Sequence, residues 1–269
     1  MSFYTSLNGL KNAQTDLGVI AHNIANVETT GFKKGRTEFA DIVVASATSN
    51  PRMTQGLGAR VEAITQNFAL GPIEQTGSAL DVAIGGDGFF SMRAPDGSTL
   101  YTRNGSFGID GAGFINDGSD NRLQVFPTDA AGVVTSMTPT DAQIPAVNGA
   151  GAEFAGISVG DNGLVAATYA DGSQLNVGTV ALASFIAPTG LKQLGSSNWE
   201  STGLSGPATY GLPNQGAYGA LMSGALERSN VDIAEELVGL ITAQRNFQAN
   251  AKAIDTATQI SQTIMNLRT

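Results

Sequence analysis

The sequence predicts an α+β protein, with N- and C-terminal helices paired as a coiled coil plus a central all-β domain. That domain is expected to be antiparallel and of Greek-key or barrel type. Two observations support this class. Apolar residues recur every three or four positions at both ends of the chain, as they do on one face of a helix. The middle of the chain instead has short apolar runs separated by turn signals, which is typical of antiparallel strands.

The N-terminal helix is expected within residues 1–28. Its apolar stripe comprises Phe3, Leu7, Leu10, Gln14, Leu17, Ala21 and Ile24. The sequence "NVETTG" that follows is rich in residues that end helices and form turns. The helix should therefore stop near residues 26–28.

The C-terminal helix is expected within residues 223–269, running from Val231 to Arg268. At 1.5 Å per residue its length would be about 57 Å, which is long for an ordinary globular domain. Few oppositely charged pairs lie along it, so it should bury one face against the N-terminal helix. The alternative is two helices packed on a sheet within one domain. The expected coiled-coil and polymer contacts are Leu7, Leu10, Leu17, Ile24, Leu237, Ile241, Phe247, Ile254 and Ile264.

The middle of the chain divides into two parts. Residues 29–69 are expected to be an extended connector with some strand, and residues 70–222 to be the β domain. Within the β domain, turn signals such as Pro95-Asp96-Gly97 and Asp171-Gly172 separate runs such as "LDVAI" and "LVAATY". The Gly-rich residues 205–219 are expected to be a flexible return to the last helix, and Gly56 is a second candidate hinge.

Composition excludes several classes of function. The net charge of −9 and a pI near 4.5 argue against binding to nucleic acid or to an anionic membrane. Charged residues make up only 14% of the chain, which indicates that much of its surface is covered by neighbouring molecules. The N-terminus lacks the basic region and the apolar core of a Sec signal peptide, and no apolar run is long enough to span a membrane.

The sequence offers no recognisable catalytic or metal centre. It contains no Cys and a single His, His22, which is expected to be structural because no partners for a zinc site or a catalytic triad accompany it. No phosphate-binding loop is present. We therefore expect no enzyme activity, no cofactor and no metal. Lys33, Lys34 and Arg36 form a small basic cluster, which we expect to meet acidic residues of a neighbouring copy.

Two terminal motifs resemble those of the bacterial flagellar rod and hook proteins. The sequence "NIANVETTGFKKGRTEFAD" is similar to their N-terminal pattern, N-x-A-N-x-x-T-x-G-F. Near the other end, "SGALERSNVDIAEELVGLITAQRNFQANAKAI" resembles their C-terminal signature. Together with similar segments in the middle, the resemblance covers the first ~125 and last ~115 residues. The signature residues are Asn23, Ala25, Asn26, Thr29, Gly31 and Phe32.

The resemblance implies a structural subunit that polymerises into a helical tube of the flagellum. The motifs favour a subunit of the hook, the universal joint that transmits torque from rod to filament, but without the usual outer inserted domain of hook proteins. The alternative is a rod protein of the basal body, proximal or distal. A further alternative, from another class, is a secreted β-domain binding module with a coiled-coil stalk.

The resemblance also implies partners and a location. The partners would be copies of the same chain, the adjoining axial proteins (rod, hook–filament junction and cap) and the flagellar type III export apparatus. Phe39, Ile42 and Val43 match the place where hook-class subunits carry an export-gate recognition stretch. The location would be the hook or basal body, extracellular for a hook or periplasmic for a rod, reached without a cleaved Sec signal. The helical ends are expected to be disordered before assembly.

Overall fold

The computed structural model describes residues 2–43 and 56–266, and it confirms the α+β class. The chain forms two compact units. Residues 1–27, 34–67 and 231–269 make up one, called here the helical unit. Residues 28–33 and 68–230 make up the other, called here the sheet unit. The chain passes between the units at residues 27/28, 33/34, 67/68 and 230/231, so the helical unit consists of three separate segments.

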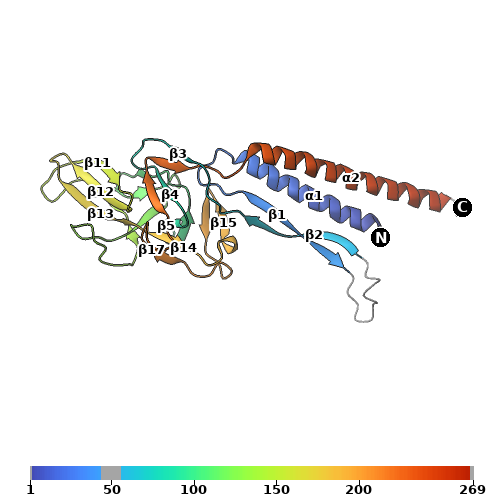
Figure 1. Ribbon diagram of the computed structural model, residues 1–269, viewed down its shortest axis with the longest axis horizontal. Coiled ribbons are helices and arrows are strands. Elements are labelled where there is room, and N and C mark those ends of the chain that lie inside the picture. The colour runs from blue at the N-terminus through green and yellow to red at the C-terminus, as the bar shows by residue number, and fades with distance from the viewer. Residues whose placement is uncertain (1, 44–55, 267–269) are drawn as a thin grey trace. The chain divides into compact units, whose positions relative to one another are not determined.

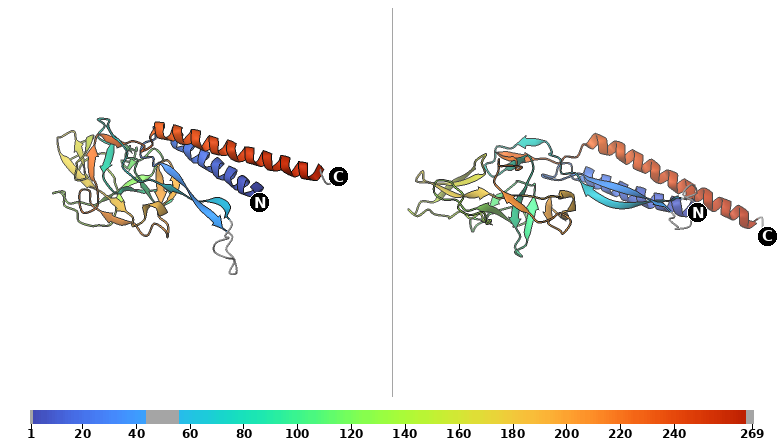
Figure 2. Two further views of the ribbon diagram at one scale, coloured as in Figure 1. Left: turned by 45° about the vertical axis from the view of Figure 1, so that its right-hand side comes forward. Right: turned by 60° about the horizontal axis from the view of Figure 1, so that its bottom comes forward.

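The helical unit contains the two long helices, α1 (Ser2–Ala25) and α2 (Ile233–Asn266). They lie side by side (Figures 1 and 2). Their directions are opposite, because Gly9 of α1 faces Asn250 of α2 and Ile20 of α1 faces Gly239 of α2. Neither helix is apolar enough, over its described length, to cross a membrane.

Two antiparallel strands complete the helical unit: β1 (Gly35–Val43) and β2 (Gly56–Gln66). The side-chain amide of Asn12 in α1 donates to the carbonyl oxygen of Ala59 in β2 at 2.8 Å, which fixes the strand pair to the helix. The residues expected to form an extended connector thus include two paired strands. Gly56, one of the expected hinges, is the first residue of β2.

The sheet unit is built from short antiparallel strands. The N-terminal half of the unit contributes β3 (Ile73–Gln75), β4 (Val82–Gly85), β5 (Phe89–Arg93), β6 (Thr99–Thr102), β7 (Gly108–Ile109), β8 (Ile115–Asn116), β9 (Arg122–Phe126) and β10 (Thr140–Asp141). The C-terminal half contributes β11 (Phe154–Val159), β12 (Leu164–Tyr169), β13 (Gln174–Val180), β14 (Leu182–Ser184), a 3-10 turn (Pro188–Gly190), β15 (Lys192–Gly195), β16 (Asn198–Glu200), β17 (Thr209–Gly211), β18 (Ala220–Ser223) and β19 (Ala225–Glu227).

One large sheet dominates this unit, with the strand order β11-β12-β13-β9-β5-β6-β16-β15. Side chains of β5, β9, β12 and β13 pack on one core, in which Phe90, Met92, Val125, Val165 and Leu182 are almost fully buried. A second, aromatic cluster surrounds the buried Trp199, whose ring meets Phe68 and Phe89 edge-on. These two cores account for the apolar alternation of the middle sequence.

The prediction that residues 205–219 form a flexible return segment was wrong. Thr209–Gly211 form β17, which pairs with β14, and the Ser205 side chain is fully buried. Tyr218 holds the segment further, because its hydroxyl donates to the carbonyl oxygen of Thr209 at 2.8 Å. Gly and Pro here shape tight turns and close packing instead of leaving the chain free. Within residues 223–269, the stretch Ala225–Glu227 pairs with β3, and helix begins only at Ile233.

Candidate assembly site

The N-terminal signature begins where α1 ends. Asn26 closes the last turn, because its backbone amide and its side-chain amide both donate to the carbonyl oxygen of His22, at 3.2 and 2.9 Å. The backbone bond continues the i→i−4 pattern of the helix, and the side-chain bond adds a second donor to the same carbonyl at the end of α1. Ala25, the last helical residue, is exposed, and Thr29 is half-buried. The chain then leaves the helical unit at Glu28.

Asn23 joins three elements of the helical unit. Its side chain is 1% exposed. The amide nitrogen donates to the carbonyl oxygen of Gly35 at 2.9 Å and to Oε2 of Glu236 at 3.0 Å, and the amide oxygen accepts from the Gly35 backbone at 2.9 Å. A buried amide that finds all these partners fixes the beginnings of β1 and α2 against α1. These contacts give the Asn23 side chain a structural role in the helical unit.

Lys34 strengthens the same junction in the helical unit. Its ammonium lies 2.8 Å from Oε1 of Glu236 and 3.0 Å from Oε2 of Glu235. Partial burial disfavours the charged form of Lys34, but the hydrogen bonds with Glu236 and Glu235 outweigh this effect and raise the pKa of Lys34. Glu236 thus serves both Asn23 and Lys34, and it is itself buried.

Gly31 and Phe32 belong to the sheet unit. The backbone of Gly31 has a φ of +68°, and its amide donates to the carbonyl oxygen of Glu227 at 2.8 Å. A Cβ placed there would come within 2.6 Å of the Arg103 backbone, so both the conformation and the space require glycine. Phe32 follows with 4% exposure and anchors the turn in the sheet unit.

A buried cluster of three charges holds this turn in place. The Lys33 ammonium lies 2.5 Å from Oε1 of Glu227 and donates to the carbonyl oxygen of Ala69 at 2.8 Å. The guanidinium of Arg103 lies 3.3 Å from the other oxygen of Glu227, and the Gly71 amide donates to Oε1 at 2.9 Å. Burial lowers the pKa of Lys33, with the attraction of Glu227 acting against it.

The expectation that the basic cluster meets acidic residues of a neighbouring copy was wrong for Lys33 and Lys34. Both find carboxylates within their own chain. The two lysines are consecutive, yet Lys33 is paired in the sheet unit and Lys34 in the helical unit. Sequence analysis missed Arg103, Glu227 and Glu236 as partners. The available signal was that Glu227 and Glu236 lie inside the C-terminal signature, which invites pairing with the lysines of the N-terminal one.

The structure separates the expected helix contacts into two groups. Leu7, Leu10, Leu17, Ile24, Phe247 and Ile254 are half-buried, whereas Leu237, Ile241 and Ile264 are exposed. The buried or half-buried positions of α2 that follow its start are Glu236, Gly239, Leu240, Ala243, Phe247, Asn250, Ala251, Ile254 and Ala257. The apolar stripe of α2 is therefore wider than α1 can cover. Phe39 and Val43 of β1 are exposed and Ile42 is half-buried.

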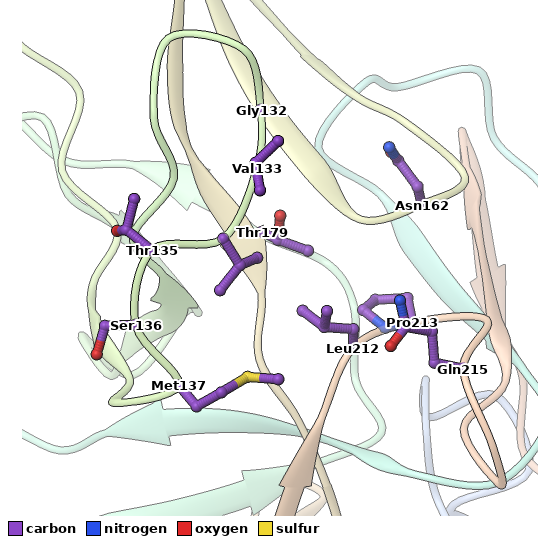
Figure 3. A pocket seen from close by; sticks show the side chains of 11 residues that line it. Gly132, Val133, Thr135, Ser136, Met137, Asn162, Thr179, Leu212, Pro213 and Gln215 are labelled. Carbon is purple, nitrogen blue, oxygen red and sulfur yellow. The ribbon is translucent and has the colours of Figure 1, made fainter.

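The described residues contain no group of three or more His, Asp or Glu side chains that could hold a metal ion. The sheet unit has a cavity of about 460 Å³ near Val133, Met137, Asn162, Leu212 and Pro213 (Figure 3). No acid, base or nucleophilic Cys lines this cavity, so its walls supply no group for acid–base catalysis.

Comparisons with known proteins agree with the terminal motifs. Residues 3–33 match the model of the flagella basal body rod protein family. Residues 83–167 match the D1 domain of flagellar hook protein FlgE/F/G, and residues 222–267 match the C-terminal region of flagellar basal body rod FlgEFG proteins. The flagellar basal-body rod protein FlgG of Bacillus subtilis is 37% identical over 99% of this chain and 98% of its own length. The chain belongs to the flagellar rod and hook protein family.

Other members of this family show the same full-length match. The basal-body rod protein FlgG of Agrobacterium fabrum is 36% identical over 94% of each chain. The flagellar hook protein FlgE of Escherichia coli is 27% identical, and its alignment spans all of both chains but needs 410 positions. Because this chain has 269 residues, the hook relative carries sequence with no counterpart here. The chain is thus a structural protein of the flagellar axis, a family whose members polymerise with neighbouring flagellar components.

Proposed function

We propose that this chain is a rod subunit of the flagellar basal body, which polymerises with copies of itself into a helical tube that transmits torque. The supporting observation is how closely the number of aligned positions agrees with the length of this chain. The rod relatives of B. subtilis and Borreliella burgdorferi align over 278 and 279 positions, close to the length of this chain. The hook relatives need 410 positions. The comparisons thus favour the rod alternative over the hook function that the sequence motifs suggested.

The proposed polymer contacts use the terminal helices, which would pair as a coiled coil. Leu7, Leu10, Leu17, Ile24, Phe247 and Ile254 would hold the pair together, and the exposed Leu237, Ile241 and Ile264 would face other subunits. Exposed apolar side chains of this size on one helix are typical of an interface. Contacts between unlike surfaces of identical subunits produce an open helical assembly. The domain limits given by the sequence, 1–28, 29–69, 70–222 and 223–269, remain part of this proposal.

We further propose that the chain reaches the periplasm through the flagellar type III export apparatus. Phe39, Ile42 and Val43 are the proposed recognition stretch. They lie on β1, where Phe39 and Val43 are 47% and 49% exposed. A recognition segment must be accessible before assembly, and these two apolar side chains meet that requirement. Adjoining rod and hook proteins are the proposed axial partners.

The deciding experiment is electron microscopy of basal bodies from a strain of the source bacterium that lacks this gene. A rod subunit predicts missing or shortened rods, with the complete structure restored by the wild-type gene on a plasmid. Complete rods without hooks would instead assign the chain to the hook. Normal rods and hooks would refute both functions and would favour a secreted binding module.

A further inference from the structure

Two large apolar side chains of the sheet unit project from adjoining loops. Ile186 is 89% exposed and Leu204 is 83% exposed, the two highest values among the large apolar side chains that the structure describes. Residues 186–190 and 202–206, which carry them, include no charged residue. Single exposed apolar side chains are common, but a pair gathered on adjoining loops indicates a contact site. We call Ile186 and Leu204 the apolar knob.

Hydrogen bonds hold the knob in a fixed position. The Ala187 amide donates to the carbonyl oxygen of Ser205 at 3.4 Å. The Thr202 hydroxyl donates to the carbonyl oxygen of Gly190 at 2.6 Å, so the two loops are joined at two places. The Ser205 side chain is fully buried, and its hydroxyl accepts from the Thr202 amide at 2.9 Å. The loops therefore lose little conformational freedom when a partner covers the knob, which favours association.

The cavity of about 460 Å³ in the same unit suits apolar side chains. Every described residue that lines it is uncharged. Figure 3 shows Val133, Met137, Leu212 and Pro213 around it. Val133 and Met137 are 62% and 59% exposed, so part of its apolar wall is open to solvent. In another protein, a cavity of about 150 Å³ is large enough to bind benzene. This cavity therefore has room for two aliphatic side chains.

The knob and the cavity lie at opposite ends of one strand ladder. Ser184 of β14 lies opposite Thr209 of β17 at one end, and the knob lies beyond this end. Leu182 lies opposite Gly211 at the other end, and residues 212–213 of the cavity follow directly. Because the loop hydrogen bonds keep the knob at its own end, a copy cannot fill its own cavity. A second copy can fill it and leave its own cavity open to a third, so this contact between unlike surfaces continues without closing.

We propose that the apolar knob of one copy inserts into the cavity of a neighbouring copy, with Leu204 against Met137. Charge supports this choice of partner. The chain has a net charge of −9, so copies repel one another, yet neither the knob loops nor the described cavity lining carries a charge. Two copies can therefore meet there without desolvating a charged group. The inference rests on the proposed function, since it requires a polymer of this chain, and it adds a defined contact between sheet units.

The chain has no native Cys, so engineered cysteines can report this contact without background. Leu204→Cys and Met137→Cys are supplied on two plasmids as the only copies in the deletion strain. Basal bodies are isolated, oxidised and analysed on non-reducing gels. A disulfide requires Cα atoms within about 7 Å. We expect covalent dimers from the two variants together, and monomers from each variant alone.

A matched control makes the cross-link specific. Val147→Cys replaces Met137→Cys in the mixture, because Val147 is 51% exposed in the same unit but does not line the cavity. We expect this mixture to give no dimers.

A second experiment tests the contact without a cross-link. Leu204→Lys places a cation in an uncharged cavity, and we expect the number of completed rods per cell to fall about tenfold or more. Met137→Glu in the same chain supplies an anion to the inserted lysine and should restore rods in part. Both side chains are exposed in a single copy, so the purified variants should unfold at the wild-type temperature.

The outcomes separate the inference from the function on which it rests. Normal rods without dimers from the Leu204/Met137 mixture overturn the contact and leave the rod function intact. Dimers of equal yield from the Val147 control, or from Leu204→Cys alone, also overturn the contact. So do wild-type numbers of rods in the Leu204→Lys strain, or a loss that Met137→Glu does not relieve. Rods that contain no copy of this chain overturn the function and the contact together.

Discussion

Lys33 and Glu227 form an ion pair that is buried on both sides, with 2.5 Å between Nζ and Oε1 and side-chain exposures of 0% and 1%. Glu227 also pairs with Arg103 and accepts from the Gly71 amide. One carboxylate therefore balances two buried cations. It does so inside the turn that the N-terminal signature forms in the sheet unit.

This arrangement predicts an asymmetry between two substitutions. Glu227→Gln removes the carboxylate that the two buried cations share, and we expect it to lower the free energy of unfolding by about 3–5 kcal/mol. Lys33→Met leaves Glu227 with Arg103 and the Gly71 amide, so its cost should be clearly smaller. Urea denaturation of the purified variants, followed by Trp199 fluorescence, measures both. Equal costs, or a larger cost for Lys33→Met, would contradict the shared-anion interpretation.

Gly31 should be intolerant of any side chain. Gly31→Ala must adopt a positive φ and also place its Cβ against the backbone of Arg103 and Asn104. The conformation alone costs about 1–2 kcal/mol, and the clash should add to that cost. Gly172→Ala is the matched control, because Gly172 has a φ of +80° and no atom within 4 Å of the added Cβ. Thermal unfolding should show a clearly larger loss of stability for Gly31→Ala than for Gly172→Ala. Equal losses of stability in the two variants would rule out the clash.

Thr37 carries a buried polar atom that the structure leaves unsatisfied. Its side chain is 8% exposed, and no hydrogen-bond partner for its hydroxyl lies among the described residues. Thr37→Val replaces the hydroxyl with a methyl group and keeps the branched shape favoured in strands, so we expect a gain of about 1 kcal/mol in stability. Thr37→Ser keeps the hydroxyl and loses the methyl group, and it should destabilise. A destabilised Thr37→Val variant would show that the hydroxyl has a partner.

Lys34 should make stability depend on pH in the alkaline range. Its pKa in the folded chain is raised above 10.5, because the hydrogen bonds with Glu236 and Glu235 outweigh the effect of burial. The folded state therefore holds this proton more tightly than the unfolded state does. The resulting stabilisation is complete below 10.5 and is lost as the pH rises through the raised value.

The measurement compares wild type with Lys34→Met. Denaturation at pH about 8 and about 11.5 brackets the titration of a lysine. At the lower pH we expect wild type to have a higher free energy of unfolding than Lys34→Met. At the higher pH we expect this difference between the two proteins to be smaller. A difference that stays constant with pH would mean that Lys34 contributes packing alone.

The class of fold and the end of α1 could be predicted from sequence because they depend on local signals. The apolar stripe from Leu7 to Ile24 and the Asn26 turn are visible in neighbouring residues, and α1 does end at Ala25. The strands of the middle were visible in the same way. Residues 205–219 were wrongly predicted to be flexible, because Gly and Pro indicate turns whether or not those turns are packed. Only tertiary contacts, such as those of Tyr218, decide whether such a segment is held in place.

The candidate site was much harder to predict. Asn23 and Glu236 are 213 positions apart, and Lys33 and Glu227 are 194 apart. Nothing in the local sequence of a lysine reveals which distant carboxylate it will meet. The motifs singled out Asn23, Gly31 and Phe32, but the contacts of each residue became visible only in the folded chain.

The division of the helical unit into three segments has a consequence for how the protein is made. All residues of the sheet unit have been synthesised once residue 230 has been added, whereas α1 must wait for α2, which follows the sheet unit along the chain. Contacts between positions so distant form late and slowly. A chain that terminates early can therefore complete its sheet unit but can never close the helix pair. If assembly uses that pair, the growing structure incorporates only polypeptides whose translation has continued through α2.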